Sequence, residues 1–294
     1  MRRVVAFGAA SWNTMIRVDA FPEPLPGGIF PSGWHQTVGS SGAGKALNLA
    51  AAGVDVTLVA LLGDDEPGQR IRTALERGRV RLHAIPDTTG SAHHVNLMDP
   101  HGRRLSFMLH TGDPAARYDP ALVEALVAVA DEVLVEIVDQ ARAVLPIARR
   151  LGKRTWTDLH DTTGDREWDR DFETADRVFF SDERLPDPRP LMRRLHDTGR
   201  ELVVCTRGAA GAVAVARDGR WIEVPAEPVA AIVDTNGAGD AFLAGTVVGE
   251  LHGLPVDAAL RVGARLAALA IQSPDLAPQN RSIVTQAVAS LTAI

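Results

Sequence analysis

One stretch of the chain, residues 234–242, has side chains whose types and spacing could do chemistry. It reads DTNGAGDAF, in which Gly237, Ala238 and Gly239 come directly before the carboxylate of Asp240. An apolar run, residues 229–233, precedes the stretch, and a longer apolar segment follows it. This pattern predicts a strand, a tight turn and the first turn of a helix.

The predicted turn collects hydrogen-bond donors that can hold an anion. The first N–H groups of a helix have no partner within the helix and lie at the positive end of its dipole, and glycines let a ligand approach the backbone. A carboxylate beside a bound anion suits an enzyme that deprotonates a hydroxyl next to a phosphoryl group. The stretch therefore predicts phosphoryl transfer to an alcohol, with Asp240 as general base. The alternative for a shorter GxGD pattern is a turn capped by an aspartate.

The full nine residues closely resemble the C-terminal signature of the ribokinase-like (PfkB) family of sugar kinases, DTxGAGDxF. The resemblance implies that the amides of Gly237, Ala238 and Gly239 form the anion hole. It also implies that Asp240 is the catalytic base and contacts the sugar hydroxyl that it activates. Because some relatives have a monovalent-cation site near this loop, Asp234 is a candidate ligand for an ion such as K⁺.

A second motif, GSSGAGKALN at residues 39–48, can be interpreted in two ways. It nearly matches the P-loop pattern GxxxxGK[ST], but Ala46 stands where a hydroxyl must bind Mg²⁺. The better match is the GGKxxN motif with which ribokinase-like kinases contact the sugar. The resemblance assigns sugar contacts to Gly42, Gly44, Lys45 and Asn48.

A further sugar contact is predicted at Asn13, just after a first buried strand at residues 4–10. In ribokinase-like kinases an aspartate at this position binds sugar hydroxyls. The amide of Asn13 keeps hydrogen-bond donors and an acceptor but carries no charge.

The resemblance continues in the nucleotide-binding part of the chain. Thr206, Gly208 and Gly211 fit the family's TxGxxG loop, which predicts an ATP site. The family's NxxE motif, which orders water around Mg²⁺, is replaced by Ser181 and Arg184 at its two defining positions. Since Mg²⁺ in kinases is held largely through water and phosphate oxygens, ATP and Mg²⁺ are still the expected cofactors.

A cluster of potential metal ligands, Asp158, His160 and Asp161, follows a predicted strand. A structural zinc site would need more ligands than this cluster offers. We therefore expect these three residues to lie in a solvated loop.

Strands and helices alternate from Pro120 onward, which predicts right-handed βαβ connections and a parallel sheet with helices on both faces. Together with the motifs, this implies a ribokinase-like α/β three-layer sandwich with a mostly parallel, Rossmann-like central sheet. We expect one kinase domain over residues 1–294. Segments near residues 15–38 and 91–112 are expected to form a β-lid over the sugar site, a surface through which relatives often form homodimers.

The composition limits the partners and the location of the protein. The net charge is −6, so no electrostatic feature favours nucleic acid. The single cysteine, Cys205, fits a reducing compartment, and no apolar run is long enough to span a bilayer. We expect a cytoplasmic protein with a small-molecule substrate and with no nucleic-acid or membrane partner.

The sequence thus predicts an ATP-dependent carbohydrate kinase that phosphorylates a hydroxyl of a sugar, a nucleoside or a similar small molecule. The second hypothesis is a catalytically weak sugar or nucleoside sensor of the same fold, because Asn13 and the lost NxxE motif depart from the family pattern. The third is a P-loop NTPase built around Lys45.

Overall fold

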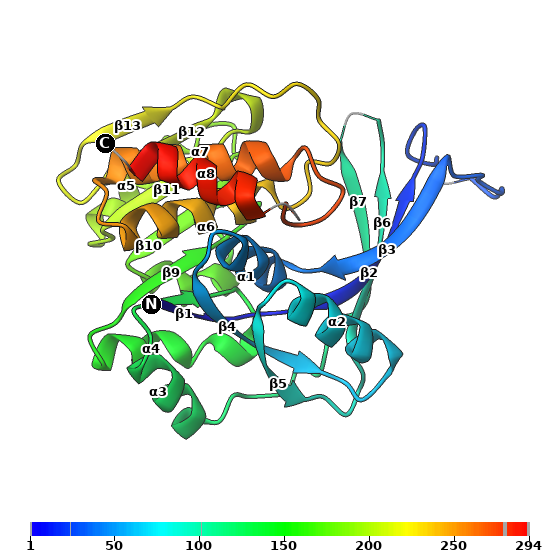
Figure 1. Cartoon of the computed structure of the whole chain (residues 1–294), viewed down its shortest axis with the longest axis horizontal. Coiled ribbons are helices and arrows are strands. Elements are labelled where there is room, and N and C mark those ends of the chain that lie inside the picture. The colour runs from blue at the N-terminus through cyan, green and yellow to red at the C-terminus, as the bar shows by residue number, and fades with distance from the viewer. Residues whose placement is uncertain (1, 24, 101, 279–280, 293–294) are drawn as a thin grey trace.

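The computed structural model describes residues 2–23, 25–100, 102–278 and 281–292, and its central element is a large, mostly parallel sheet (Figure 1). Within these residues the strand order is β13-β12-β11-β10-β9-β8-β1-β4-β5, and the antiparallel pairs are those that β12 makes with β11 and β13. The strands are apolar over most of their length because both faces of the sheet are covered. The strand bounds are β1 Arg3–Phe7, β4 Asp55–Leu62, β5 Arg81–Pro86, β8 Glu132–Val135, β9 Arg154–Asp158, β10 Arg177–Ser181, β11 Leu202–Thr206, β12 Ala212–Ala216 and β13 Trp221–Val224.

Helices cover the two faces of the central sheet. Two separate clusters of buried apolar residues, one on each face, hold the helices in place. On one face lie α1 (Ser41–Ala51), α2 (Glu66–Arg77), α6 (Ala238–Leu251), α7 (Val256–Ala270) and α8 (Arg281–Thr292). On the other face lie α3 (Pro120–Ala128), α4 (Val144–Arg150) and α5 (Arg189–Asp197). The predicted α/β three-layer architecture is therefore confirmed.

A second, four-stranded sheet projects from the side of the central sheet (Figure 1). We call it the lid sheet; its order is β3 (Gly33–Gly39), β2 (Ser11–Arg17), β6 (Ala92–Met98) and β7 (Arg104–His110). Cross-strand pairs share a face, so Asn13, Thr37 and His94 lie on one side of the sheet. Trp12 lies on the opposite side, where the guanidinium of Arg70 from α2 sits 5.6 Å from its ring centroid.

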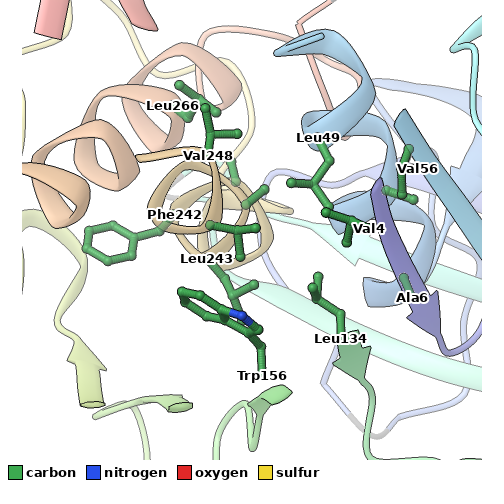
Figure 2. Packing of buried hydrophobic residues seen from close by; sticks show 14 of the residues in the cluster. Val4, Ala6, Leu49, Val56, Leu134, Trp156, Phe242, Leu243, Val248 and Leu266 are labelled. Carbon is green, nitrogen blue, oxygen red and sulfur yellow. The ribbon is translucent and has the colours of Figure 1, made fainter. Parts of the chain in front are cut away.

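The helix that follows the signature stretch, α6, lies at the centre of the larger apolar cluster (Figure 2). Phe242, Leu243 and Val248 of α6 are at most 5% exposed and pack with Trp156 of β9 and with Leu49 of α1. This packing fixes the core-facing side of α6, the helix that carries Asp240.

Three glycines let α6 and α7 approach so closely that their backbones touch. A Cβ atom on Gly245 would lie 2.7 Å from the carbonyl oxygen of Val262, and one on Gly249 would lie 2.5 Å from the Cα of Ala259. A Cβ atom on Gly263 would lie 2.6 Å from the carbonyl oxygen of Phe242. No side chain larger than hydrogen fits at these positions without displacing a helix.

One predicted element is wrong. Residues 229–233 do not form a strand, and Ile232 and Val233 are 62% and 48% exposed. The run pairs with none of the described strands, and the central sheet ends at β13. Its last N–H group, that of Val233, and the N–H of the following Asp234 both donate to the carbonyl oxygen of Ile271.

Among the described residues, no helix is both long and apolar enough to cross a membrane.

Candidate active site

The predicted site residues gather where parallel strands of the central sheet end, which is the usual place for ligands in open α/β sheets. Glu136 directly follows β8, and Asp158 is the last residue of β9. The amino-terminal turns of α1 and α6 face them and contribute Lys45 and Asp240.

The signature stretch forms a tight turn into α6, as predicted. Gly237 has a left-handed backbone, with φ of 81°, and is the residue before the helix. The N–H of Ala241 makes the first helical hydrogen bond, to the carbonyl oxygen of Gly237. Asp240, in the first turn, is only 9% exposed. A Cβ atom on Gly239 would have no heavy atom within 4 Å, so there is open space beside the backbone of Gly239.

The ammonium group of Lys45 joins three carboxylates. Its Nζ atom lies 2.6 Å from Oδ1 of Asp240, 3.0 Å from Oε1 of Glu136 and 3.1 Å from Oδ2 of Asp158. It also donates to the hydroxyl of Ser41 at 2.5 Å. The Lys45 side chain is 1% exposed, so these contacts replace its hydration.

His160 is the second cation of this cluster. Its Nε2 lies 3.3 Å from Oε2 of Glu136 and its Nδ1 lies 3.5 Å from Oδ2 of Asp158. Its backbone is left-handed, with φ of 53°, a conformation that is uncommon outside glycine. The N–H of His160 donates to Oδ1 of Asp158, and its carbonyl accepts from the N–H of Ser181 at the end of β10. We call Lys45, Glu136, Asp158, His160 and Asp240 the charge cluster.

Contacts within the charge cluster set its protonation. Burial by itself would lower the pKa of Lys45, but Asp240, Glu136 and Asp158 raise it well above its ordinary value. Burial would likewise lower the pKa of His160, yet Asp158 and Glu136 raise it to about 9. Near neutral pH Lys45 and His160 are therefore both protonated.

The three carboxylates of the charge cluster differ in basicity. Burial tends to raise the pKa of Asp158, but Lys45 and His160 lower it to about 2. Lys45 and His160 also outweigh burial at Glu136, whose pKa is lowered. At Asp240 burial prevails and raises the pKa, although Lys45 pulls in the other direction. Asp240 is therefore the carboxylate of the cluster best suited to accept a proton.

Two glycines leave room for carboxylates of the charge cluster to lie against the backbone. A Cβ atom on Gly44 would lie 2.4 Å from Oδ2 of Asp240, so this oxygen rests directly on the α1 backbone. A Cβ atom on Gly8 would lie 2.6 Å from Cγ of Glu136. Neither position has room for a side chain.

The predicted sugar contacts divide into two groups. Asn13 is buried on the inner side of the lid sheet, where its Oδ1 accepts from the hydroxyl of Ser11 at 2.7 Å. Gly42 packs against the backbone of Ala9, and the Nδ2 of Asn48 donates to the carbonyl oxygens of Gly44 and Leu276. In this structure Gly42 and Asn48 fix the position of α1, whereas Asn13 faces the site.

The predicted nucleotide loop lies at the end of β11, beside β10. Thr206 pairs with Ser181 in the sheet, and its carbonyl accepts from the N–H of Asp182. Gly208 and Gly211 both have positive φ, and a Cβ atom on Gly211 would lie 2.0 Å from the carbonyl oxygen of Val224. The loop shape therefore depends on its glycines.

The β6–β7 hairpin of the lid sheet touches the signature stretch. The hydroxyl of Thr235 donates to the carbonyl oxygen of Gly102 at 2.8 Å, and the guanidinium of Arg104 donates to Oδ1 of Asn236. The lid sheet thus lies over the glycine turn at the start of α6.

Comparison with known proteins agrees with this geometry. Residues 175–282 match the sequence pattern of the pfkB family carbohydrate kinases. Acarbose 7(IV)-phosphotransferase of Actinoplanes sp. is 35% identical over 284 residues, which cover 92% of each chain. The chain belongs to the pfkB family of carbohydrate kinases. An ATP-dependent ribose-1-phosphate kinase of Halopiger xanaduensis is 30% identical over 269 residues, or 88% of each chain.

Solved structures confirm that this carbohydrate kinase has the ribokinase-like fold. A microbiome-derived acarbose kinase superposes with a TM-score of 0.86 at 27% identity, covering 100% of this chain and 99% of its own. A ribokinase of Arabidopsis thaliana, solved with ribose and ATP, gives a TM-score of 0.81 at 20% identity with the same coverage, a likeness of fold alone. The predictions of fold and of an ATP-dependent carbohydrate kinase are both confirmed.

The P-loop alternative is wrong for this kinase. A P-loop joins a buried parallel strand to a helix, but the strand before Lys45 is β3, at the edge of the lid sheet. Lys45 itself lies in the second turn of α1 and points its ammonium into the charge cluster.

The prediction of a solvated loop at the end of β9 is wrong, and two residues of the site were not predicted. Asp158 and His160 were expected in a solvated loop, but Asp158 is 6% exposed and both belong to the charge cluster. Glu136 and Ser41 were not predicted at all. Glu136 directly follows β8, and Asp158 is the last residue of β9. This position at the carboxyl end of a parallel strand is the signal that could have identified Glu136.

A polar hollow lined by Arg2, Glu132, Arg154 and Glu250 lies at the opposite, amino-terminal end of the strands. It contains none of the predicted site residues of the kinase.

Proposed function

We propose that this kinase transfers the γ-phosphoryl group of ATP to a hydroxyl of a sugar or sugar-like molecule, with Asp240 as general base. The observation that carries the proposal is a buried carboxylate of raised pKa in the first turn of α6, beside the turn formed by Gly237, Ala238 and Gly239, where the backbone of Gly239 faces open space. The acceptor oxygen forms a bond to phosphorus, the bond from phosphorus to ADP breaks, and Asp240 takes the hydroxyl proton. The amides stabilise the charge that develops on the phosphoryl oxygens.

The acceptor is bound between α1 and the inner side of the lid sheet. Asn13, His35, His94 and Asn96 lie on that side, because each pairs across the sheet with another residue of the same face. Burial lowers the pKa of His94 to about 4, so its ring is neutral and can donate one hydrogen bond and accept another. A polar, mostly uncharged surface of this kind suits an acceptor rich in hydroxyl groups.

Acarbose is the first acceptor to test. The Actinoplanes relative and the superposed microbiome-derived structure are both acarbose kinases by name. Ribose 1-phosphate, cytidine and fructoselysine are the next acceptors to test, because other relatives are named as kinases of these molecules.

Asp240 can be tested directly with a coupled assay of ADP release over this acceptor panel and ribose. Asp240→Asn is expected to lower kcat on the best acceptor by about 10² to 10⁴-fold. Asp197→Asn, at the exposed end of α5, is the matched control and should leave kcat unchanged. Wild-type turnover by Asp240→Asn would show that another group is the base.

Mg²⁺ would enter the site with ATP. The two positions of the family's NxxE motif, at the end of β10, hold Ser181 and Arg184. The guanidinium of Arg184 lies 3.6 Å from Oδ2 of Asp161. These two residues therefore do not fit a metal ion held by protein ligands. No group of three metal-binding side chains occurs among the described residues. The phosphate oxygens and water would therefore provide most of the Mg²⁺ ligands.

A monovalent cation fits poorly at Asp234. Its Oδ1 already accepts from the N–H of Asn236, and the charges of Arg104, His35 and Arg17 act on it. K⁺ activation at Asp234 stays a prediction, and comparing turnover in potassium and in tetramethylammonium salts tests it.

A sugar or nucleoside sensor is the second candidate function. The loss of the NxxE motif, with the cation of Arg184 at its second position, favours it. Such a protein would be thermally stabilised by a member of the acceptor panel and by ATP, and would release no ADP.

The apolar residues on the outer side of the lid sheet lead us to propose a homodimer that forms through this sheet. Trp34, Leu105 and Phe107 are 67%, 41% and 48% exposed there, a concentration of apolar surface that is unusual for a free face. Light scattering should give the mass of two chains, and Trp34→Asp with Phe107→Asp should give the mass of one. A monomeric wild type would refute the dimer.

The cytoplasmic location also stays a prediction. Its basis is the single cysteine, Cys205, which is free and buried in β11. Fractionation of the native cells would test it.

A further inference from the structure

The hydroxyl of Ser41 lies between the acid and the cation at the centre of the site. It donates to Oδ1 of Asp240 at 2.6 Å and accepts from Nζ of Lys45 at 2.5 Å. Since Lys45 also donates to the same Asp240 oxygen at 2.6 Å, the three groups form a closed triangle of hydrogen bonds. A hydroxyl can take this position because it donates one hydrogen bond and accepts another.

The fold brings Ser41 to Asp240 through helical spacing. Ser41 is the first residue of α1, and residues three and four positions later in a helix lie on the same face. Those residues are Gly44 and Lys45. This one face of α1 therefore contacts both oxygens of Asp240: Oδ1 through Ser41 and Lys45, and Oδ2 through the bare Cα of Gly44.

The neighbouring serine shows that this contact is specific. Ser40 has a left-handed backbone, with φ of 70°, which turns the chain from β3 into α1. Its hydroxyl donates to Ser11, away from Asp240. The residue that precedes α1 makes no side-chain capping hydrogen bond. The hydroxyl of Ser41, by contrast, makes its hydrogen bonds with Asp240 and Lys45.

We propose that Ser41 is a positioning residue for phosphoryl transfer. Its hydroxyl fixes the carboxylate of Asp240 in one orientation, so that the free lone pair of the base points toward the acceptor hydroxyl. This inference rests on the proposed role of Asp240 as the base. A rotated carboxylate would still be buried and charged but would meet the acceptor at an unproductive angle.

The hydrogen bond from Ser41 has a second consequence. A donor to a carboxylate stabilises its ionised form and lowers its pKa. Removal of the Ser41 hydroxyl should therefore make Asp240 protonate at higher pH. A serine that only packs would not change this titration.

The experiment compares Ser41→Ala and Ser41→Thr with the wild type. Ser290→Ala is the matched control, because Ser290 is an exposed serine of α8. Kinetics on the best acceptor give kcat, the two KM values and the pH profile. In parallel, ¹³C-carboxyl NMR follows the titration of Asp240, with Asp240→Asn used to assign its signal.

Ser41→Ala is expected to lower kcat by about tenfold or more with little change in the KM for ATP, and to move the acid limb of the kcat profile upward. The Asp240 signal should titrate at higher pH in the same variant. Ser41→Thr, which keeps the hydroxyl, should restore both properties. Ser290→Ala should match the wild type.

Two outcomes would overturn the inference. One is a Ser41→Ala enzyme with the wild-type kcat and acid limb. The other, which needs no turnover, is an Asp240 titration that Ser41→Ala leaves unchanged. If the wild type phosphorylates no acceptor, the proposed function fails, and the NMR titration still decides the role of Ser41. If Ser41→Ala does not fold, Ser41→Cys, with its weaker donor, replaces it in both measurements.

Discussion

The Nζ atom of Lys45 lies 2.6 Å from Oδ1 of Asp240, although 195 residues separate them in the chain. The contact joins the first helix of the central core, α1, to the helix that carries the proposed base, α6. It keeps a cation beside that base before any substrate binds. The fold itself therefore places a positive charge beside the proposed base.

Replacement of Lys45 by Met should destabilise the kinase and reduce its turnover. Three carboxylates would lose their shared cation, and the loss of one partner from a buried ion pair costs about 3 to 5 kcal/mol in the free energy of unfolding. Urea unfolding measures this loss. Lys153→Met is the control, since Lys153 makes one hydrogen bond, to the carbonyl of Ala130, and its removal should cost about 1 kcal/mol. Equal unfolding midpoints for the two variants would contradict the shared role of Lys45.

Gly44→Ala should impair catalysis more than folding. The new methyl group would lie 2.4 Å from Oδ2 of Asp240, so the carboxylate must move. A displacement of this size is expected to lower kcat about a hundredfold. Gly28→Ala, where a Cβ atom meets nothing within 4 Å, should show wild-type kinetics. A fully active Gly44→Ala enzyme would mean that Asp240 does not act from the position described.

Gly239→Ala tests the proposed anion hole by a different route. The backbone of Gly239 does not have positive φ, and the space above it is open, so alanine should leave the stability unchanged or raise it by up to about 1 kcal/mol. The methyl group would nevertheless occupy the approach of the phosphoryl group to the amides. We expect a lower kcat/KM for ATP together with an unchanged or higher melting temperature. If both properties stay at the wild-type level, the phosphoryl group does not bind over Gly239.

The ion pairs of His160 should make the stability depend on pH. Its pKa rises from 6.5 to about 9 on folding, so the folded state holds the proton more tightly. The contribution of His160 is fully present below pH 6.5 and is lost as the pH rises to about 9. His160→Asn keeps a residue that tolerates the left-handed backbone but removes the charge.

Urea unfolding of both proteins between these two pH values measures the effect. The wild type should lose more stability than His160→Asn over that interval. His83→Asn, on the edge strand β5, should behave as the wild type does. Parallel curves for the wild type and His160→Asn would exclude the ion pairs as the cause.

The fold was predictable from the sequence because its signals are local. The apolar strands, the turn at Gly237 and the start of α6 all follow from short-range patterns. The strand at residues 229–233 was wrong for a reason that short-range patterns do not contain. An apolar run becomes a strand only if its backbone groups pair with a neighbouring strand, and the N–H of Val233 donates instead to the carbonyl oxygen of Ile271.

The charge cluster was only partly predictable. Lys45 and Asp240 stand in recognisable motifs, whereas Glu136 and His160 belong to loops with no motif of their own. Their roles arise because β8 and β9 are adjacent in the sheet and end side by side. That adjacency is a property of the sheet topology, and the sequence of neither loop predicts it.

The backbone contact between α6 and α7 has a consequence for how the enzyme can move. Gly245, Gly249 and Gly263 leave no space between the two helices, so α6 cannot slide without carrying α7 with it. We therefore expect the proposed base and the amide turn to keep a fixed position relative to α7 during the reaction cycle. We expect substrate entry and product release to depend on the lid sheet, whose described contacts with the signature stretch are hydrogen bonds from Thr235 and Arg104. In that case the opening of the lid sheet would limit the rate of turnover, while the groups that do the chemistry would keep a fixed arrangement.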